Sequence, residues 1–179
     1  PESSPLGSVQ PLVNQLPFVT VLSEEGIQSI HQASMRLLKE QGVLVLDYPP
    51  ARETFRDHGA QVEEDLVRID EDTLMHFVRQ APDSFKQLAR NPENNLVVGG
   101  NHMVFVPVYG PPFVSDLDGG RRSATLADFH NFVRLAYMSP HMHHSGGTLV
   151  EPNDVDVRER HLDMLLAHIT LSDKAFMGS

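Results

Sequence analysis

The pattern that most constrains the fold lies in residues 141–179. Residues 142–147 have the composition of a strand, and a loop and an amphipathic helix follow them before a second strand begins at Ala175. A strand, a crossover helix and a further strand make the repeating unit of a parallel sheet, and one unit cannot close a sheet or a barrel. We therefore expect an α/β protein in which residues 141–179 start a TIM-type (β/α)8 barrel, and a chain truncated after its first βα unit.

The helix predicted within this unit carries a row of apolar residues. The spacing places them on one face, which we expect to be the buried face: Leu162, Leu165, Leu166 and Ile169. His161 and His168 then fall at the edge of that face, and we expect both to lie at the solvent boundary or at an interface.

The residues before position 141 predict a different kind of structure. Residues 1–22 are rich in Pro, Ser and Gln and are expected to form an extended arm, and residues 23–140 an α+β segment. Ser23 and Asp70 are good N-caps, Gly42 suits the end of the first helix, and the run after it could be a buried strand. A further helix is predicted behind a capping box formed by Thr125 and Asp128.

Short apolar runs between residues 85 and 117 indicate β-structure. They are separated by turn-forming Asn, Gly and Pro residues, including those at Gly99-Gly100 and at Tyr109-Gly-Pro-Pro112. This arrangement is typical of a meander, and we expect one small antiparallel sheet.

The composition excludes several classes of protein. The formal charge is -10, from 14 basic and 24 acidic residues, which argues against a nucleic-acid-binding protein. No apolar run approaches the roughly 20 residues that a membrane-spanning helix needs. The chain has no cysteine and hence no disulfide framework. We therefore expect a soluble, cytoplasmic protein that binds neither nucleic acid nor membrane.

Histidines suggest one candidate site. His141 and His143 are two residues apart, so on a strand they would share a face and could bind one metal ion, as in a metal-dependent barrel hydrolase. Their position at the start of the predicted strand counts against this, because barrel active sites lie at the carboxyl ends of the strands. The alternative is that these histidines are packing and hydrogen-bonding residues, and on that interpretation we predict no metal site.

Two loops suggest a second candidate site. Thr148 and Glu151 follow Gly146-Gly147 at the carboxyl end of the predicted strand, where a barrel would have its catalytic mouth. Tyr109 and Phe113 lie in a loop rich in Gly and Pro, and aromatic faces attract quaternary ammonium groups. We name these four as low-specificity substrate-binding candidates. An ordinary turn explains the loop at Thr148 and Glu151 equally well and is the favoured interpretation of the loop at Tyr109 and Phe113, and no residue is identified as catalytic.

Several segments, in order, resemble the front part of the trimethylamine methyltransferase family. The resemblance spans roughly residues 17–179 and rests on these stretches: 22–43, Ala89-Arg-Asn-Pro92 with Val98-Gly-Gly100, 112–119 with 124–128, and 160–165 with Ser172-Asp-Lys174. It implies a barrel preceded by a helical and β segment. It also implies transfer of a methyl group from a methylated amine, such as trimethylamine or glycine betaine, to a corrinoid.

The resemblance further implies that the corrinoid (cobalamin) is carried by a separate partner protein, with none bound within this chain. Some family members contain pyrrolysine in a later part of the barrel. We expect a homo-oligomer and an isolated chain that is inactive, because a barrel begun with one unit leaves apolar helix faces uncovered. A non-catalytic assembly fragment is the third alternative, beside the metal-dependent hydrolase.

Overall fold

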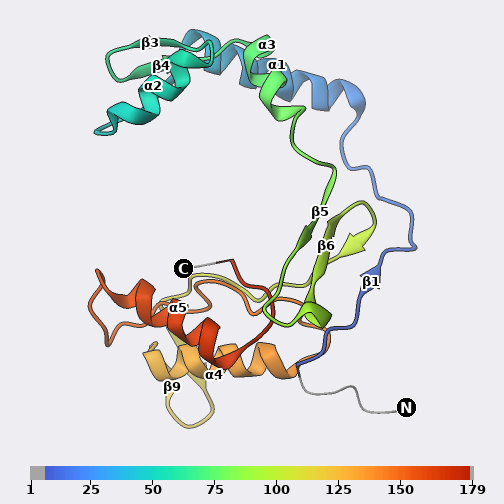
Figure 1. Ribbon diagram of the computed structural model, residues 1–179, viewed down its shortest axis with the longest axis vertical. Helices are drawn as coiled ribbons and strands as arrows, with labels where there is room; N and C mark the ends of the chain where they lie inside the picture. Colours follow the sequence, from blue (N-terminus) through green and yellow to red (C-terminus); the bar gives the residue numbers. More distant parts are fainter. Residues whose placement is uncertain (1–6, 178–179) are drawn as a thin grey trace. The chain divides into compact units, whose positions relative to one another are not determined.

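A computed structural model describes residues 7–177 of the chain (Figure 1). The chain divides into two compact units. We call residues 16–82 the inner unit, and residues 7–15 together with 83–177 the flanking unit. The predicted domain limits at residues 22 and 140 stay a prediction.

The inner unit consists of helices and one small antiparallel sheet. Its sheet has the strand order β2-β4-β3, and α1 is its longest helix. The elements are α1 Glu24–Glu40, β2 Val43–Leu44, α2 Pro49–Asp57, β3 Gln61–Glu63, β4 Leu66–Arg68 and α3 Glu71–Val78.

Capping residues set the helix limits in the inner unit, as the sequence predicted. The Ser23 hydroxyl accepts a hydrogen bond from the Gly26 amide at 3.2 Å, and the Asp70 carboxylate accepts one from the Thr73 amide at 2.8 Å. Gly42 adopts a φ of 74° and donates its amide to the Leu37 carbonyl, which ends α1.

The expectation of a buried strand after Gly42 is wrong. Val43 and Leu44 form β2 at the edge of the sheet, and the side chains of Val43, Leu44 and Leu46 are exposed. The central strand β4 is covered instead, and its Val67 is fully buried. The apolar run therefore marked an edge strand and not the middle of a core.

The flanking unit contains three separate antiparallel pairs of strands, so the expectation of one sheet is wrong. The pairs are β1-β7, β5-β6 and β8-β9. Gly99-Gly100 separates β6 from β7, and the proline-rich stretch 107–112 separates β7 from β8, so these neighbouring strands do not join into one sheet. The elements are β1 Leu12–Val13, β5 Ser84–Gln87, a 3-10 turn Pro92–Asn94, β6 Leu96–Gly99, β7 His102–Met103, β8 Phe113–Asp116 and β9 Gly120–Ser123.

Helices α4 (Leu126–Met138) and α5 (Arg160–Leu171) lie side by side and enclose the main core (Figure 1). The predicted capping box begins α4: Asp128 donates its amide to the Thr125 hydroxyl, and the Asp128 carboxylate accepts the Thr125 amide. Apolar residues from both helices, from strand β8 and from two loops fill the core: Val114, Ala124, Phe129, Val133, Leu149, Val150, Met164 and Ala167.

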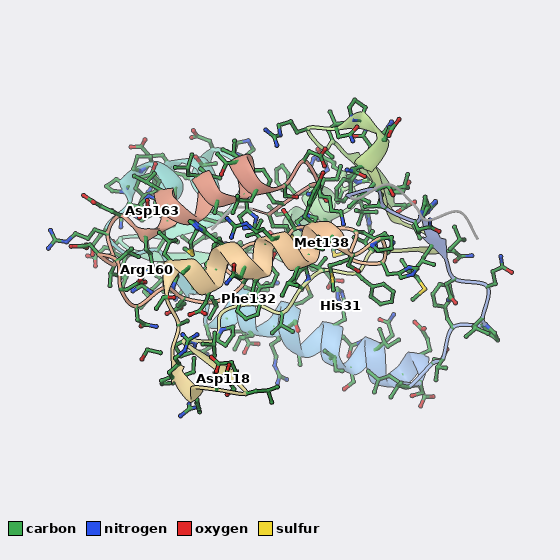
Figure 2. The ribbon with its side chains drawn as sticks, turned by 90° about the horizontal axis from the view of Figure 1, so that it is seen from below. His31, Asp118, Phe132, Met138, Arg160 and Asp163 are labelled. Atoms are coloured by element: carbon green, nitrogen blue, oxygen red, sulfur yellow. The ribbon has the colours of Figure 1, made fainter. Side chains whose placement is uncertain are left out.

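The buried face of α5 differs from the predicted one. Met164, Ala167 and His168 face the core, whereas Leu162 and Leu166 are each 57% exposed. His168 is fully buried, so its predicted place at a solvent boundary is also wrong. Figure 2 shows residues of both helices, including Phe132 and Met138 on α4, which are exposed as well.

The predicted strand–helix–strand unit is present as a single parallel bridge. His144 pairs with Ala175 in parallel, with α5 between them in the chain. Ser145 donates its amide to the Ala175 carbonyl, and Met177 donates its amide to the Gly146 carbonyl, both at 2.9 Å. The described residues thus form a mixed α/β structure with small antiparallel sheets. Among them, no helix is both long and apolar enough to cross a membrane.

Candidate functional site

The structure brings together the two loops that carry the substrate-binding candidates. The Gly110 amide donates to the Thr148 carbonyl at 2.7 Å, and the Glu151 amide donates to the Pro111 carbonyl at 3.0 Å. These bonds hold residues 109–112 against residues 148–151, which are about 40 positions away in the chain. The sequence suggested the two loops separately and gave no signal that they would meet.

The two aromatic candidates, Phe113 and Tyr109, differ in what surrounds their rings. Phe113 begins β8, and the guanidinium of Arg121 lies 3.9 Å from the centre of its ring. Tyr109 is 42% exposed in the loop before it, and partial burial raises the pKa of its phenol. One face of the Phe113 ring already has a cation against it, whereas Tyr109 remains open to solvent.

Glu151 is also paired with a cation. Its carboxylate lies 3.4 Å from Nη1 of Arg160, the first residue of α5. Figure 2 shows Arg160 with Asp163 near that end of the helix. Thr148 is half-buried and contributes its backbone carbonyl to the loop contact.

An apolar groove of about 410 Å³ lies beside these loops in the flanking unit. Phe113 lines it, whereas Tyr109, Thr148 and Glu151 lie outside it. The other lining residues come mainly from the 107–115 segment, α4 and the loop after residue 147: Pro107, Val108, Pro111, Val114, Ser115, Phe132, Leu135, Ala136, Ser139, Met142, Leu149 and Val150.

The metal-dependent hydrolase is not favoured, because His143 has a backbone partner at each ring nitrogen. The Phe105 amide donates to Nδ1 at 2.9 Å, and Nε2 lies 2.8 Å from the Gln10 carbonyl, to which it donates. His143 is buried, whereas His141 is exposed. Among residues 7–177, no three His, Asp or Glu side chains are placed to hold a metal ion. His143 therefore acts as a hydrogen-bonding link between the chain start and residue 105.

His144, Ser145 and His168 form a buried polar cluster that the sequence did not reveal. His168 donates from Nε2 to the Gly147 carbonyl at 2.9 Å, and its Nδ1 lies 3.2 Å from the Ser145 hydroxyl. The His168 ring stacks on Phe176 and meets the edge of Phe129. Burial lowers the pKa of His144 to about 4, with a contribution from His168, and burial also lowers the pKa of His168.

Lys174 is a second buried group that the sequence analysis missed. Its ammonium donates to the carbonyls of Ala136, Ser139 and Met142 at 2.6–2.9 Å, which secures the end of α4. Burial lowers the pKa of Lys174 to about 8, against the neighbouring Asp173 charge, which raises it. The one feature of the sequence that could have indicated its burial is its position directly before the apolar run Ala175-Phe-Met177.

Two of the segments that carried the family resemblance contact each other. The Arg90 guanidinium donates to the Ser172 carbonyl at 2.8 Å, and the Asn94 amide side chain donates to the Asp173 carboxylate at 2.9 Å. Asn94 is fully buried. The Ala89–Pro92 and Ser172–Lys174 motifs are thus parts of one structural contact.

Comparison with known proteins identifies the family. The trimethylamine methyltransferase (MTTB) family matches residues 2–179. A glycine betaine methyltransferase from Desulfitobacterium hafniense (strain Y51) is 46% identical over 92% of this chain and 34% of its own length. A proline betaine:corrinoid methyltransferase from Eubacterium limosum is 34% identical over 69% of this chain and 25% of its own length.

An L-carnitine:corrinoid methyltransferase from Eubacterium limosum is 28% identical over 83% of this chain and 30% of its own length. The chain spans about a third or less of the length of these relatives. Because the family match extends over almost every residue, the chain belongs to the trimethylamine methyltransferase family.

Proposed function

We propose that this chain is the N-terminal part of a methyltransferase that moves a methyl group from a quaternary amine, glycine betaine in the first instance, to a corrinoid on a partner protein. The observation that carries the proposal is the 46% identity to a glycine betaine methyltransferase over 92% of the chain. The lower identity of 27% to a trimethylamine methyltransferase from Desulfitobacterium hafniense makes a betaine the preferred donor.

The reaction sets a clear task for the protein. The bond between nitrogen and the methyl carbon breaks, the electron pair stays on nitrogen, and a neutral tertiary amine leaves. The corrinoid, when bound to its partner, supplies a strongly nucleophilic cobalt that accepts the methyl group. The chain itself must bind a cation, exclude water and align the methyl group with the acceptor.

The joined loops 109–113 and 148–151 are the proposed place for that cation. Aromatic faces and a carboxylate both attract a quaternary ammonium group, and Tyr109, Phe113 and Glu151 provide them. Two of these groups already have arginine partners, Arg121 and Arg160. Substrate binding there would therefore involve either Tyr109 and Thr148 alone or displacement of one guanidinium.

A barrel that continues beyond residue 179 is part of the same proposal. The parallel bridge between His144 and Ala175 around α5 supports it, because this is the connection that a barrel repeats. The exposed Leu162 and Leu166 on α5 also support it, because neighbouring helices of a barrel would cover them. We further propose a homo-oligomer in the cytoplasm.

Methyl transfer by the full-length protein tests the proposal. The protein is mixed with its corrinoid partner in the reduced state and with glycine betaine, proline betaine, carnitine or trimethylamine, and methylation is followed by the absorbance of the corrinoid. We expect the largest rate with a betaine. Absence of methylation with all four amines, while the corrinoid remains reducible and can be methylated chemically, would contradict it.

A further inference from the structure

The β8–β9 hairpin is a short, rigid projection of the flanking unit. Phe113 pairs with Ser123 at its base and Asp116 pairs with Gly120 at its end, so that residues 117–119 form the turn. Gly120 has a φ of 62°, the conformation that closes such three-residue turns. The Asp116 carboxylate accepts the amides of Asp118 and Gly119, which fixes the turn from inside.

Arg122 holds the hairpin against α4. Its guanidinium contacts the Asp128 carboxylate through both Nη atoms, at 2.6 and 2.8 Å, and lies 3.2 Å from Asp116. Asp128 belongs to the capping box of α4, so the hairpin is attached to a helix whose inner face is in the core. A forked pair of this kind restricts orientation as well as distance.

Both ends of the hairpin are also bonded to the loop that follows residue 148. The Asn153 side-chain amide donates to the Pro112 carbonyl at 2.9 Å, and the Asn153 backbone amide donates to the Ala124 carbonyl at 2.8 Å. The Ala124 amide in turn donates to the Pro112 carbonyl at 3.2 Å. The hairpin therefore rises directly from the proposed substrate-binding loops.

The tip of the hairpin presents one apolar side chain to solvent. Leu117 has a relative exposure of 104%, the highest value among the large apolar side chains of residues 7–177. Val114, on the same hairpin, points into the core. A leucine on a turn whose backbone is already fixed loses little conformational freedom when a partner covers it, so the entropic cost of covering it is small.

We infer that the β8–β9 hairpin is a docking element for the corrinoid protein, with Leu117 as its apolar contact. The inference rests on the proposed function. The cobalt must come within bonding distance of the methyl group, so the corrinoid protein has to cover the elements around the substrate. The hairpin is fixed to those elements at both ends, so a protein that covers them also meets the tip of the hairpin.

The Michaelis constant for the corrinoid protein tests the inference, measured with the full-length protein at saturating methylated amine. We expect Leu117→Asp to raise this constant about tenfold, because the substitution would bury a charged carboxylate in an apolar contact. The constant for the amine and the methylation rate of free cobalamin in the Co(I) state should stay unchanged, because neither involves docking.

Leu88→Asp is the matched control. Leu88 is 72% exposed in the same unit. It directly follows β5, which pairs with β6 and does not belong to the β8–β9 hairpin. The substitution should leave the constant for the corrinoid protein unchanged. A rise of less than twofold for Leu117→Asp, or an equal rise for Leu88→Asp, would overturn the inference.

A crosslink identifies the partner directly and does not depend on a loss of activity. Leu117→Cys, labelled with a photoreactive group, should join to the corrinoid protein on illumination. A crosslink confined to a second copy of the enzyme, or to a later part of its own chain, would overturn the inference. Failure of the unmodified enzyme to methylate either the corrinoid protein or free cobalamin would instead remove the proposed function, and the docking inference with it.

Discussion

The two units of the chain differ in how they bury apolar side chains. The flanking unit encloses Phe129, Val133 and Val150 completely, between two helices, strand β8 and two loops. In the inner unit none of the helices α1, α2 and α3 has a buried residue, and Val67 on the central strand is its fully buried apolar side chain. Among residues 7–177, the inner unit has three α-helices and the flanking unit has two, but only the flanking unit encloses a cluster of buried apolar side chains.

The difference shows what holds each unit together. Elements of the inner unit begin and end at local signals, such as the Ser23 and Asp70 caps, and they leave Ile30, Leu37 and Leu44 exposed. Elements of the flanking unit depend on contacts between distant residues, including Arg90 with Ser172 and His143 with Gln10. Stability in the flanking unit should therefore respond to core mutations, and in the inner unit to local ones.

The largest predicted effect comes from a core phenylalanine. Phe129→Ala should destabilise the flanking unit by about 4 kcal/mol, because the ring is fully buried and its removal leaves a cavity. Phe77→Ala is the matched change in the inner unit, where the ring is 43% exposed, and it should cost roughly 2 kcal/mol or less. Hydrogen exchange of the amides in α4 and in α3 measures the two units separately. Equal losses would show that the inner unit has a comparable core.

Sequence reasoning succeeded where structure is decided locally. It predicted the start of α1 at Ser23, its end at Gly42, and the capping box at Thr125, because each depends on residues within about four positions. It also predicted the family, from motifs that lie in order along the chain.

It failed where two distant segments decide the outcome. The pairing of β7 with β1 requires residues about 90 positions apart to meet, and nothing in either segment indicates its partner. The buried face of α5 is fixed by His168, which bonds to the Gly147 carbonyl and packs on Phe129. Hydrophobic periodicity favoured the leucine face instead, since it does not count a neutral, fully hydrogen-bonded histidine as a core residue.

Acid should weaken the flanking unit selectively. Burial lowers the pKa of His144 to about 4, with His168 contributing, whereas an unfolded histidine has a pKa near 6.5. Between pH 6.5 and about pH 4, His144 is protonated in the unfolded chain but stays neutral in the folded chain. Its full contribution to the free energy of unfolding is therefore present above pH 6.5 and is lost as the pH falls. The loss between pH 7 and pH 5 should be about 2 kcal/mol from this residue.

Urea unfolding followed by circular dichroism at the two pH values checks this effect. His144→Gln is the control variant, because it keeps a hydrogen-bonding side chain and removes the titration, and it should reduce the pH dependence. The described part of the inner unit buries no histidine. A loss that is the same in His144→Gln as in the unmodified protein would assign the acid sensitivity to other groups.

The smallest predicted effect compares two helix caps. Ser23→Ala should cost about 1 kcal/mol, and because α1 has no buried residue the loss should appear as fraying of its first turn. Thr125→Ala removes a similar cap from α4, yet that turn remains held by Phe129 in the core and by the pair between Arg122 and Asp128. Exchange of the amides at residues 26–28 should therefore accelerate in Ser23→Ala, whereas those at residues 128–130 should change less in Thr125→Ala. Equal fraying in the two helices would mean that the core does not support the start of α4. The difference between the two units in core support would then not extend to the ends of their helices.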